Sequence, residues 1–178
     1  EELLIIRTDA VDASQALSLR KGAVVGTSSA RRKSQLKMFR PEVTITDLRG
    51  NVPTRVEKLR TGNYDAILLA KAGIDRLGLD LSEFQVRVLD PRWFVPAPAQ
   101  GALAVQSRRD DAQANEAAED LHDDDAALCV GLERAVLFGY RGGCQVPLGV
   151  PAVKTPNSFS LWASGARTRH PTPVRIPL

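Results

Sequence analysis

The stretch AVVGTSSARRKSQLKMF, residues 23–39, decides the fold of this chain. It opens with a short apolar run, Ala23–Val25, which predicts a strand that ends at the following glycine. Ala30–Phe39 then predicts a helix. Ser28 or Ser29 is suited to cap that helix, because a serine hydroxyl accepts one of the backbone N–H groups that the first turn leaves free. A strand that leads through a short turn into a helix is the repeating unit of an α/β fold.

The same alternation continues on both sides of this stretch. Val43–Thr46 alternates polar and apolar residues as a strand does, and Asn51 is suited to cap a second helix. Ala66–Ala70 is a continuous apolar run, which is typical of a strand covered on both faces, and a short helix around Ile74–Leu77 follows it. Toward the N-terminus, Leu3–Ile6 predicts one further strand. Strands and helices in this order predict a parallel sheet with helical crossovers.

The chain changes character at residues 95–101, VPAPAQG, whose prolines and glycine favour a connection between domains. Ala102–Val105 then predicts a strand, and residues 110–140 predict one or two helices. Phe159–Ala163 has strand character, while the last residues are rich in proline and arginine and show no buried pattern. We therefore expect a second, shorter domain after the α/β domain.

Composition and charge narrow the classes of function. The 178 residues are 43% hydrophobic and 25% charged, which is ordinary for a soluble globular protein. The net charge of +3 is too mild to argue for nucleic-acid binding, and no apolar run approaches the roughly 20 residues of a membrane-spanning helix. The two cysteines, Cys129 and Cys144, do not form a disulfide framework, so we expect a reduced, cytoplasmic setting. His122 and His170 lack neighbours at ligand spacing, so we expect no metal site.

Arginines gather where the predicted strands end and the predicted helices begin, and ligands of open parallel sheets bind at that edge. Arg31 and Arg32 stand in the first turn of a helix, where the dipole disfavours cations, so the pair indicates that an anion binds there. A guanidinium pairs with a carboxylate through two parallel hydrogen bonds. The alternative is a set of solvated surface arginines, which is the ordinary case for one arginine but less so for five. The candidate anion-binding residues are Thr27, Ser28, Ser29, Arg31, Arg32, Arg49, Arg55 and Arg76.

The spacing of these residues leaves the anion open, but the glycine–lysine spacing of a P-loop is absent, which argues against a nucleoside triphosphate. A second candidate is Cys144 in the segment RGGCQVPLG, residues 141–149. Glycines free its backbone and Arg141 favours a thiolate, so Cys144 is suited to act as a nucleophile or a covalent anchor. The alternative is an incidental free thiol. Cys129, inside a helical pattern, is interpreted as a small buried apolar residue.

Taken together, these segments resemble the motifs of the porphobilinogen deaminase family. They occur in the family's order and cover most of residues 22–150. The motifs are GTSSARR (26–32), DLRGNVPTR (47–55), YDAILLA (64–70), AGIDRLG (72–78), PAQGA (98–102), ERA (133–135) and GGCQVP (142–147).

The resemblance implies an enzyme of three domains, the first two like periplasmic binding proteins, that joins porphobilinogen units into hydroxymethylbilane with loss of ammonia. It also implies a dipyrromethane cofactor held by a thioether, for which the matching residue is Cys144. The arginines and hydroxyl residues named above match positions that hold the acetate and propionate groups of cofactor and growing tetrapyrrole. The implied partners are porphobilinogen and that linear chain, with no nucleic acid or membrane. A monomer is implied for the full-length protein.

The resemblance begins after the family's first domain, which carries the catalytic aspartate. We therefore expect this chain to lack that domain, which would have to be supplied in cis or in trans. We expect the chain alone to bind anions but not to catalyse turnover, and its catalytic residue is unknown. The implied fold is α/β, a periplasmic-binding-protein-like domain with a parallel-sheet core plus a truncated α+β C-terminal domain. The predicted parts are a hinge strand from the first domain (1–6), a pyrrole-carboxylate-binding domain (7–94), a crossover segment (95–109) and a cofactor-attachment domain (110–178).

Two other functions fit part of the pattern. A non-catalytic, periplasmic-binding-like module for a small dicarboxylate explains the arginines but leaves Cys144 without a role. A nucleic-acid surface built from Arg31, Arg32, Lys33 and Lys37 lacks nearby aromatic residues, on which single-stranded bases normally stack.

Overall fold

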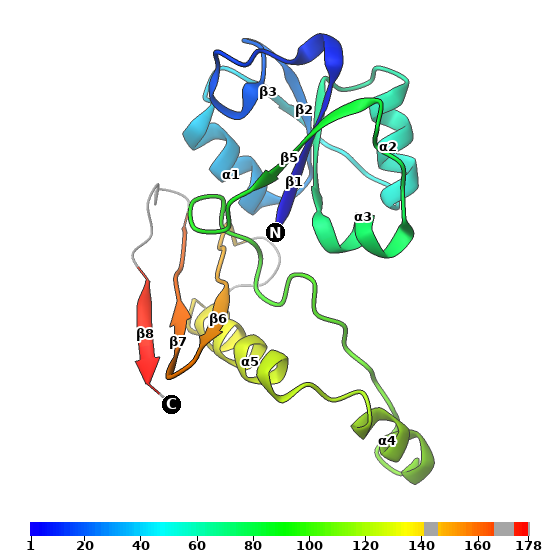
Figure 1. Ribbon diagram of the computed structural model, residues 1–178, viewed down its shortest axis with the longest axis vertical. Helices are drawn as coiled ribbons and strands as arrows, with labels where there is room; N and C mark the ends of the chain where they lie inside the picture. The colour runs from blue at the N-terminus through cyan, green and yellow to red at the C-terminus, as the bar shows by residue number, and fades with distance from the viewer. Residues whose placement is uncertain (141–145, 166–172, 178) are drawn as a thin grey trace.

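The computed structural model describes residues 1–140, 146–165 and 173–177. It has two parts, a five-stranded sheet with helices and a smaller three-stranded sheet beside a long helix (Figure 1). The elements of the first part are β1 (Glu2–Arg7), 3₁₀ turns at Thr8–Ala10 and Ala16–Ser18, β2 (Val24–Gly26), α1 (Ala30–Phe39), β3 (Thr44–Thr46), α2 (Val52–Arg60), β4 (Ala66–Ala70), α3 (Lys71–Leu77) and β5 (Phe84–Leu89). In the described residues, no helix is both long and apolar enough to span a bilayer.

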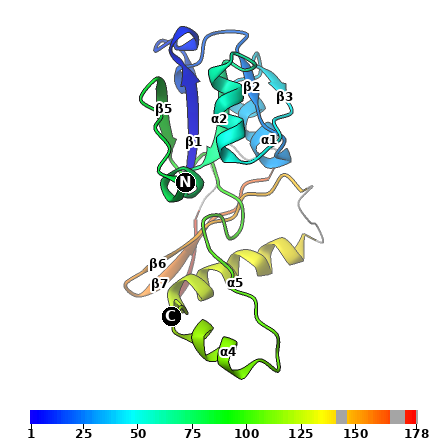
Figure 2. The ribbon, with the colours of Figure 1, turned by 90° about the vertical axis from the view of Figure 1, so that its right-hand side faces the viewer.

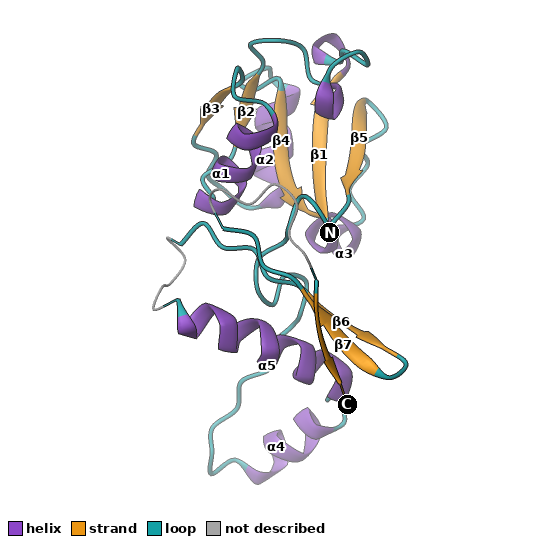
Figure 3. Ribbon diagram, turned by 90° about the vertical axis from the view of Figure 1, so that its left-hand side faces the viewer, coloured by secondary structure: helices purple, strands orange, loops and turns teal. Residues whose placement is uncertain are grey.

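The five strands lie in the order β3-β2-β4-β1-β5, which Figure 3 shows across the upper half of the molecule. The strands β3, β2 and β4 are parallel, which confirms the predicted parallel-sheet core, whereas β1 runs antiparallel to both β4 and β5. The sheet is therefore mixed. Because β1 is antiparallel to β4, Glu2 pairs with Ala70, so the start of β1 lies beside the carboxyl end of β4.

Both faces of this sheet are covered, which explains its continuous apolar strands. Leu4 and Ile6 of β1 pack on the face covered by α1, whereas Leu3 and Ile5 pack on the opposite face with side chains of α2 and α3. All four β1 side chains are buried. Since alternate residues of a strand point to opposite faces, only a strand buried on both sides needs every position to be apolar.

The starts of α1 and α2 agree with the sequence predictions. Ser29 accepts a hydrogen bond from the backbone N–H of Arg32 at the start of α1, and Asn51 accepts one from Thr54 at the start of α2. The helix α3 begins at Lys71, directly after β4 and three residues before the predicted Ile74. Local side-chain chemistry therefore defines where α1 and α2 begin, whereas α3 begins without a side-chain cap.

The second part contains α5 packed beside two antiparallel strands, with α4 further away (Figure 2). Its core is small and consists of Leu148, Val150 and Leu161, against which Leu132 and Val136 of α5 are packed. The elements are α4 (Ala112–Glu119), α5 (Asp124–Gly139), β6 (Ala152–Thr155), β7 (Ser158–Leu161) and β8 (Val174–Pro177), with the strands in the order β6-β7-β8.

One predicted strand is wrong. The described residues Ala102–Val105 form no strand pairing, and Leu103 is 77% exposed. A strand needs a neighbour to pair its backbone groups, and no strand of the described chain lies beside this segment. The division into four parts that the sequence predicts stays a prediction; the structure adds that residues 2–7 form an inner strand of the large sheet.

Candidate functional site

Arg31 is buried at the carboxyl edge of the parallel strands, where α1 begins. Its side chain is 5% exposed. One terminal nitrogen donates to the backbone oxygen of Val95 at 2.8 Å, and the other donates to Glu2 Oε1 at 2.5 Å and to Gln100 Oε1 at 3.1 Å. Burial lowers the pKa of Arg31, and the nearby Glu2 carboxylate partly opposes that shift. Arg31 therefore joins α1 to β1 and to the crossover segment.

Arg32 lies beside it and is less completely bonded. Its Nη1 donates to the backbone oxygen of Leu68 at 3.1 Å, and its Nη2 lies 2.7 Å from Glu2 Oε2. That second contact is an ion pair without the alignment of a hydrogen bond, since the buried Glu2 Oε2 accepts no hydrogen bond among the described residues. The Nε of Arg32 is also buried and has no hydrogen-bond partner among those residues. One carboxylate is thus shared between two guanidinium groups.

Glu2 is the residue that sequence reasoning missed. Its side chain is fully buried, although glutamate is almost never buried unless it is paired. It reaches the arginines because the antiparallel pairing of β1 with β4 brings the start of β1 to the carboxyl edge of the sheet. The only signal in the sequence is an acidic residue directly before the apolar run Leu3–Ile6, and that signal does not show which edge the strand start will reach.

A cavity of about 590 Å³ adjoins this cluster. Two of the predicted cations, Arg32 and Arg55, line it together with the end of β4 and the starts of α2 and α3. The Nε of Arg55 donates to the backbone oxygen of Gly50 at 2.7 Å, and its terminal nitrogens make no hydrogen bond or ion pair within the described chain. The full lining is Arg32, Gly50, Asn51, Val52, Pro53, Arg55, Leu69, Ala70, Gly73 and Leu77.

Arg49 and Arg76, like Arg31, do not line this cavity. Arg76 is exposed and donates to the backbone oxygen of Gly101 at 2.6 Å, so it ties α3 to the crossover segment. Arg49 is exposed between β3 and α2. Both are close in sequence to residues that line the cavity, but of the predicted arginines the structure brings only Arg32 and Arg55 into its wall.

The three predicted hydroxyl residues are engaged within the protein. Thr27 is buried, and its hydroxyl oxygen lies 3.3 Å from the backbone N–H of Ser29, which donates to it. The Ser28 hydroxyl both donates to and accepts from the backbone of Leu48 at 3.0 Å, and Ser29 caps α1. Their local role is to hold the turn between β2 and α1, which positions the arginine pair.

The remaining candidates give a mixed outcome. Cys144 lies outside the described residues, so its role as an anchor stays a prediction. Cys129 is half-buried in α5, and burial raises the pKa of its thiol, which favours the protonated form. Asp65, directly before β4, accepts from the backbone N–H of Val24 at 2.8 Å and pairs with Arg20, so its local role is structural.

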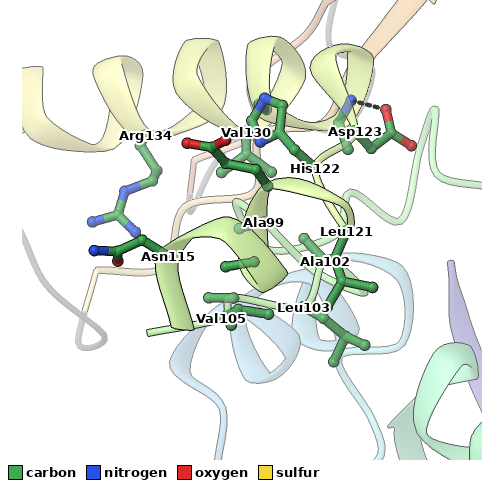
Figure 4. A pocket seen from close by; sticks show the side chains of 15 residues that line it. Ala99, Ala102, Leu103, Val105, Asn115, Leu121, His122, Asp123, Val130 and Arg134 are labelled. Carbon is green, nitrogen blue, oxygen red and sulfur yellow. Dashed lines mark hydrogen bonds between the residues drawn. The ribbon is translucent and has the colours of Figure 1, made fainter. Parts of the chain in front are cut away.

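A larger cavity, of about 710 Å³, lies between the crossover segment, α4 and α5. Arg134 and Asn115 lie at one end of it, away from Leu103 and Leu121 (Figure 4). None of the predicted arginines is among its lining residues, which include one arginine, Arg134, and two acidic residues, Glu119 and Asp123. Its charge does not favour a ligand with several carboxylates, so size alone does not identify the site.

The chemistry of the smaller cavity suits such a ligand better. A guanidinium presents hydrogen-bond donors in a rigid fork that matches a carboxylate, and two residues with such forks meet at this edge. The described cluster of Arg31, Arg32 and Glu2 also carries one positive charge in excess of its negative charge. The arrangement can therefore bind anions that carry carboxylates.

Known proteins resemble this chain closely over most of its length. Residues 1–116 match the family model described as "Porphobilinogen deaminase, dipyromethane cofactor binding domain". Porphobilinogen deaminase of Corynebacterium diphtheriae is 43% identical over 143 residues, which are 80% of this chain and 48% of that protein. Porphobilinogen deaminase of Roseiflexus sp. is 48% identical over 137 residues, 76% of this chain and 44% of that protein.

A probable porphobilinogen deaminase of Methanocella arvoryzae is 46% identical over 150 residues, which are 84% of this chain and 48% of that protein. The chain thus spans about half of the length of the curated relatives that it matches. Among solved structures, the Ancestral Cationic Amino Acid Solute Binding Protein (AncCDT-1) has a TM-score of 0.36 and 17% identity over 48% of this chain and 38% of that chain. A score that low supports no argument about the fold.

Proposed function

The chain belongs to the porphobilinogen deaminase family, and on that premise we propose that it holds the carboxylates of pyrrole substrates and of a dipyrromethane cofactor. The reaction would be the polymerisation of porphobilinogen into hydroxymethylbilane with loss of ammonia, a step toward tetrapyrroles and heme. The observation that supports this proposal is the arginine pair at the carboxyl edge of the sheet, beside a cavity that Arg32 and Arg55 line. Cytoplasmic location is part of the proposal.

The described residues fit a group with several carboxylates. Arg32 has a buried Nε without a hydrogen-bond partner among the described residues, and buried donors of this kind are rare enough to need an explanation. Arg55 offers its terminal nitrogens from the start of α2, where the helix dipole also favours an anion. When bound, the dipyrromethane group supplies the primer to which pyrrole units are joined.

Each residue would then have a distinct task. Arg32 and Arg55 bind carboxylates in the cavity, whereas Arg31 is a positioning residue because its terminal nitrogens bond to the protein itself. Arg49 and Arg76, both exposed near this edge, are available to a longer ligand. The three hydroxyl residues hold the turn before α1.

Cys144 is proposed as the attachment residue of the cofactor, on the resemblance of its segment to the family motif. No carboxylate of this chain matches the family's catalytic aspartate. We therefore propose that the chain binds its ligands without turnover unless a further domain supplies the acid–base chemistry.

Mass spectrometry of the purified chain after incubation with hydroxymethylbilane tests the attachment. We expect a covalent adduct on the Cys144 peptide of the wild type and of a Cys129→Ser variant, and none on a Cys144→Ser variant. Circular dichroism shows whether each protein is folded. A folded wild type with no adduct would contradict attachment by this chain. If it also bound porphobilinogen, the non-catalytic carboxylate-binding module would be the better description.

A further inference from the structure

The position that a ligand carboxylate would take on Arg32 is partly occupied by the protein's own Glu2. On a guanidinium, Nε–H and one terminal N–H point in parallel from the same edge, and a carboxylate pairs with both. In Arg32, Nη1 is bonded to the backbone oxygen of Leu68. The remaining edge consists of Nε and Nη2, and Glu2 Oε2 lies 2.7 Å from Nη2 while Nε has no partner among the described residues.

The two oxygens of Glu2 are held differently. Oε1 accepts an aligned hydrogen bond from Arg31 at 2.5 Å, deep in the protein. Oε2 approaches Arg32 without such alignment and accepts no hydrogen bond in the described chain. Because hydrogen-bond strength falls steeply with poor alignment, the Arg31 contact is the stronger of the two. Glu2 can therefore give up Arg32 and still remain bonded to Arg31.

We propose that Glu2 is a resident carboxylate that competes with ligand carboxylates for the Nε–Nη2 edge of Arg32, while Arg31 keeps Glu2 in place. The proposal rests on the proposed function of this cavity and adds a control on its affinity. Nε of Arg32 is buried, so a ligand oxygen reaches this edge only when Glu2 Oε2 moves off it. A ligand without an anionic group cannot replace the Glu2 charge and leaves the edge closed.

The charges of the cluster explain why the exchange is feasible. Two guanidinium groups face one carboxylate, so a second carboxylate brings the three described side chains to neutrality. Unpaired buried charges are costly, and the arriving carboxylate removes one of them. The arrangement thus favours ligands with a carboxylate, and it lowers their affinity because each must first displace Glu2 Oε2 from Arg32.

The test is calorimetric titration of the chain with porphobilinogen, comparing the wild type with Glu2→Gln. Glutamine keeps an oxygen for Arg31 but removes the competing charge, so we expect binding about tenfold tighter, on the scale of one charged hydrogen bond. Glu2→Asp withdraws the carboxylate by one methylene group and serves if Glu2→Gln does not fold. We expect its affinity for porphobilinogen to rise about threefold, because the shorter side chain loses only part of the same charged hydrogen bond. Glu57→Gln, which removes an exposed charge that pairs with Arg60, is the matched control and should leave affinity within about twofold, as for an exposed ion pair.

The outcomes separate this proposal from the function beneath it. If the wild type binds porphobilinogen and both Glu2 variants bind it equally or more weakly, the competition is overturned. The carboxylate site itself would still stand. An equal gain in Glu57→Gln would show a general charge effect and would also overturn it. If neither the wild type nor the folded Glu2 variants bind porphobilinogen, both the proposed function and the competition fail.

Discussion

The two parts of this molecule bury their apolar side chains to different extents. In the large sheet, Leu4, Ile5 and Ile6 of β1 have no exposed surface at all. On α5 of the smaller part, Leu128 is 54% exposed and Phe138 is 85% exposed. A sheet that carries helices on both faces closes its own core, whereas one helix against a three-stranded sheet buries only one stripe.

The two parts also differ in how they bury an acidic residue. Glu2 in the large sheet faces two guanidinium groups, whereas Glu133 in α5 accepts backbone N–H groups of Ala99 at 2.5 Å and Ala152 at 2.7 Å. Burial raises the pKa of Glu133, and the two backbone hydrogen bonds only partly oppose that shift. The comparison teaches that the sheet compensates a buried charge with opposite charge, and the C-terminal part with neutral donors.

The largest expected difference concerns apolar burial. Leu4→Ala should lower the free energy of unfolding by about 3–5 kcal/mol, because it opens a cavity in a closed core. The matched change Leu128→Ala, on exposed α5, should cost less than about 1 kcal/mol. Urea unfolding followed by circular dichroism measures both. Similar costs would show that the exposed face of α5 is covered in solution and would break the comparison.

The next difference concerns the arginines of the site. Arg31→Met leaves Glu2 with one imperfectly aligned partner and should lower the free energy of unfolding by about 2–4 kcal/mol, as for other broken buried pairs. Arg76→Met removes an exposed arginine and should change stability by less than about 1 kcal/mol. Both values come from urea unfolding at fixed ionic strength. An Arg31 variant as stable as the Arg76 variant would contradict the positioning role.

The pH dependence of stability tests the burial of Glu133. Because its pKa is raised in the folded protein, Glu133 holds its proton to a higher pH there than in the unfolded chain. As the pH rises above the ordinary value of 4.5 and through the raised value, the folded state binds more protons, so the free energy of unfolding falls. A Glu133→Gln variant lacks this loss.

Thermal unfolding between pH 4 and pH 7 should therefore show a wild type that loses stability relative to Glu133→Gln as the pH rises. Glu116→Gln, an exposed acid on α4, is the control and should follow the wild type at every pH. Parallel curves for wild type and Glu133→Gln would mean that Glu133 titrates as an exposed acid does.

The smallest expected effect lies in the crossover segment. Leu103 is 77% exposed, so Leu103→Ser should change the free energy of unfolding by less than about 0.5 kcal/mol. Urea unfolding next to the Leu4→Ala protein provides the scale. A cost near 2 kcal/mol, as for a buried leucine, would show that this segment packs against protein in solution.

Much of the first part follows from local sequence alone. The apolar runs predicted β1, β2 and β4, and the alternation of polar and apolar residues predicted β3. The capping residues Ser29 and Asn51 predicted where α1 and α2 begin. These features depend on side chains and backbone within a few residues of each other. The strand β5 was overlooked, although the alternation of Phe84, Val86 and Val88 is a signal that could have found it.

The site was predictable only in part. The rule that ligands bind at the carboxyl ends of parallel strands pointed to the edge where Arg32 and Arg55 line a cavity. The same rule did not distinguish Arg31, whose terminal nitrogens bond to Val95, Gln100 and Glu2, from its neighbour. Adjacent residues of a helix point in different directions, and only packing decides which of them is covered.

The sequence by itself determined the α/β alternation, the starts of α1 and α2 and the family resemblance, because these depend on neighbours along the chain. Only the tertiary structure decided that β1 lies antiparallel between β4 and β5, and hence that Glu2 reaches the arginine pair. The position and direction of β1 depend on pairing with segments far along the chain, such as Glu2 with Ala70 and Glu2 with Leu89. The apolar segment Ala102–Val105, which has no strand partner in the described chain, lies outside either sheet.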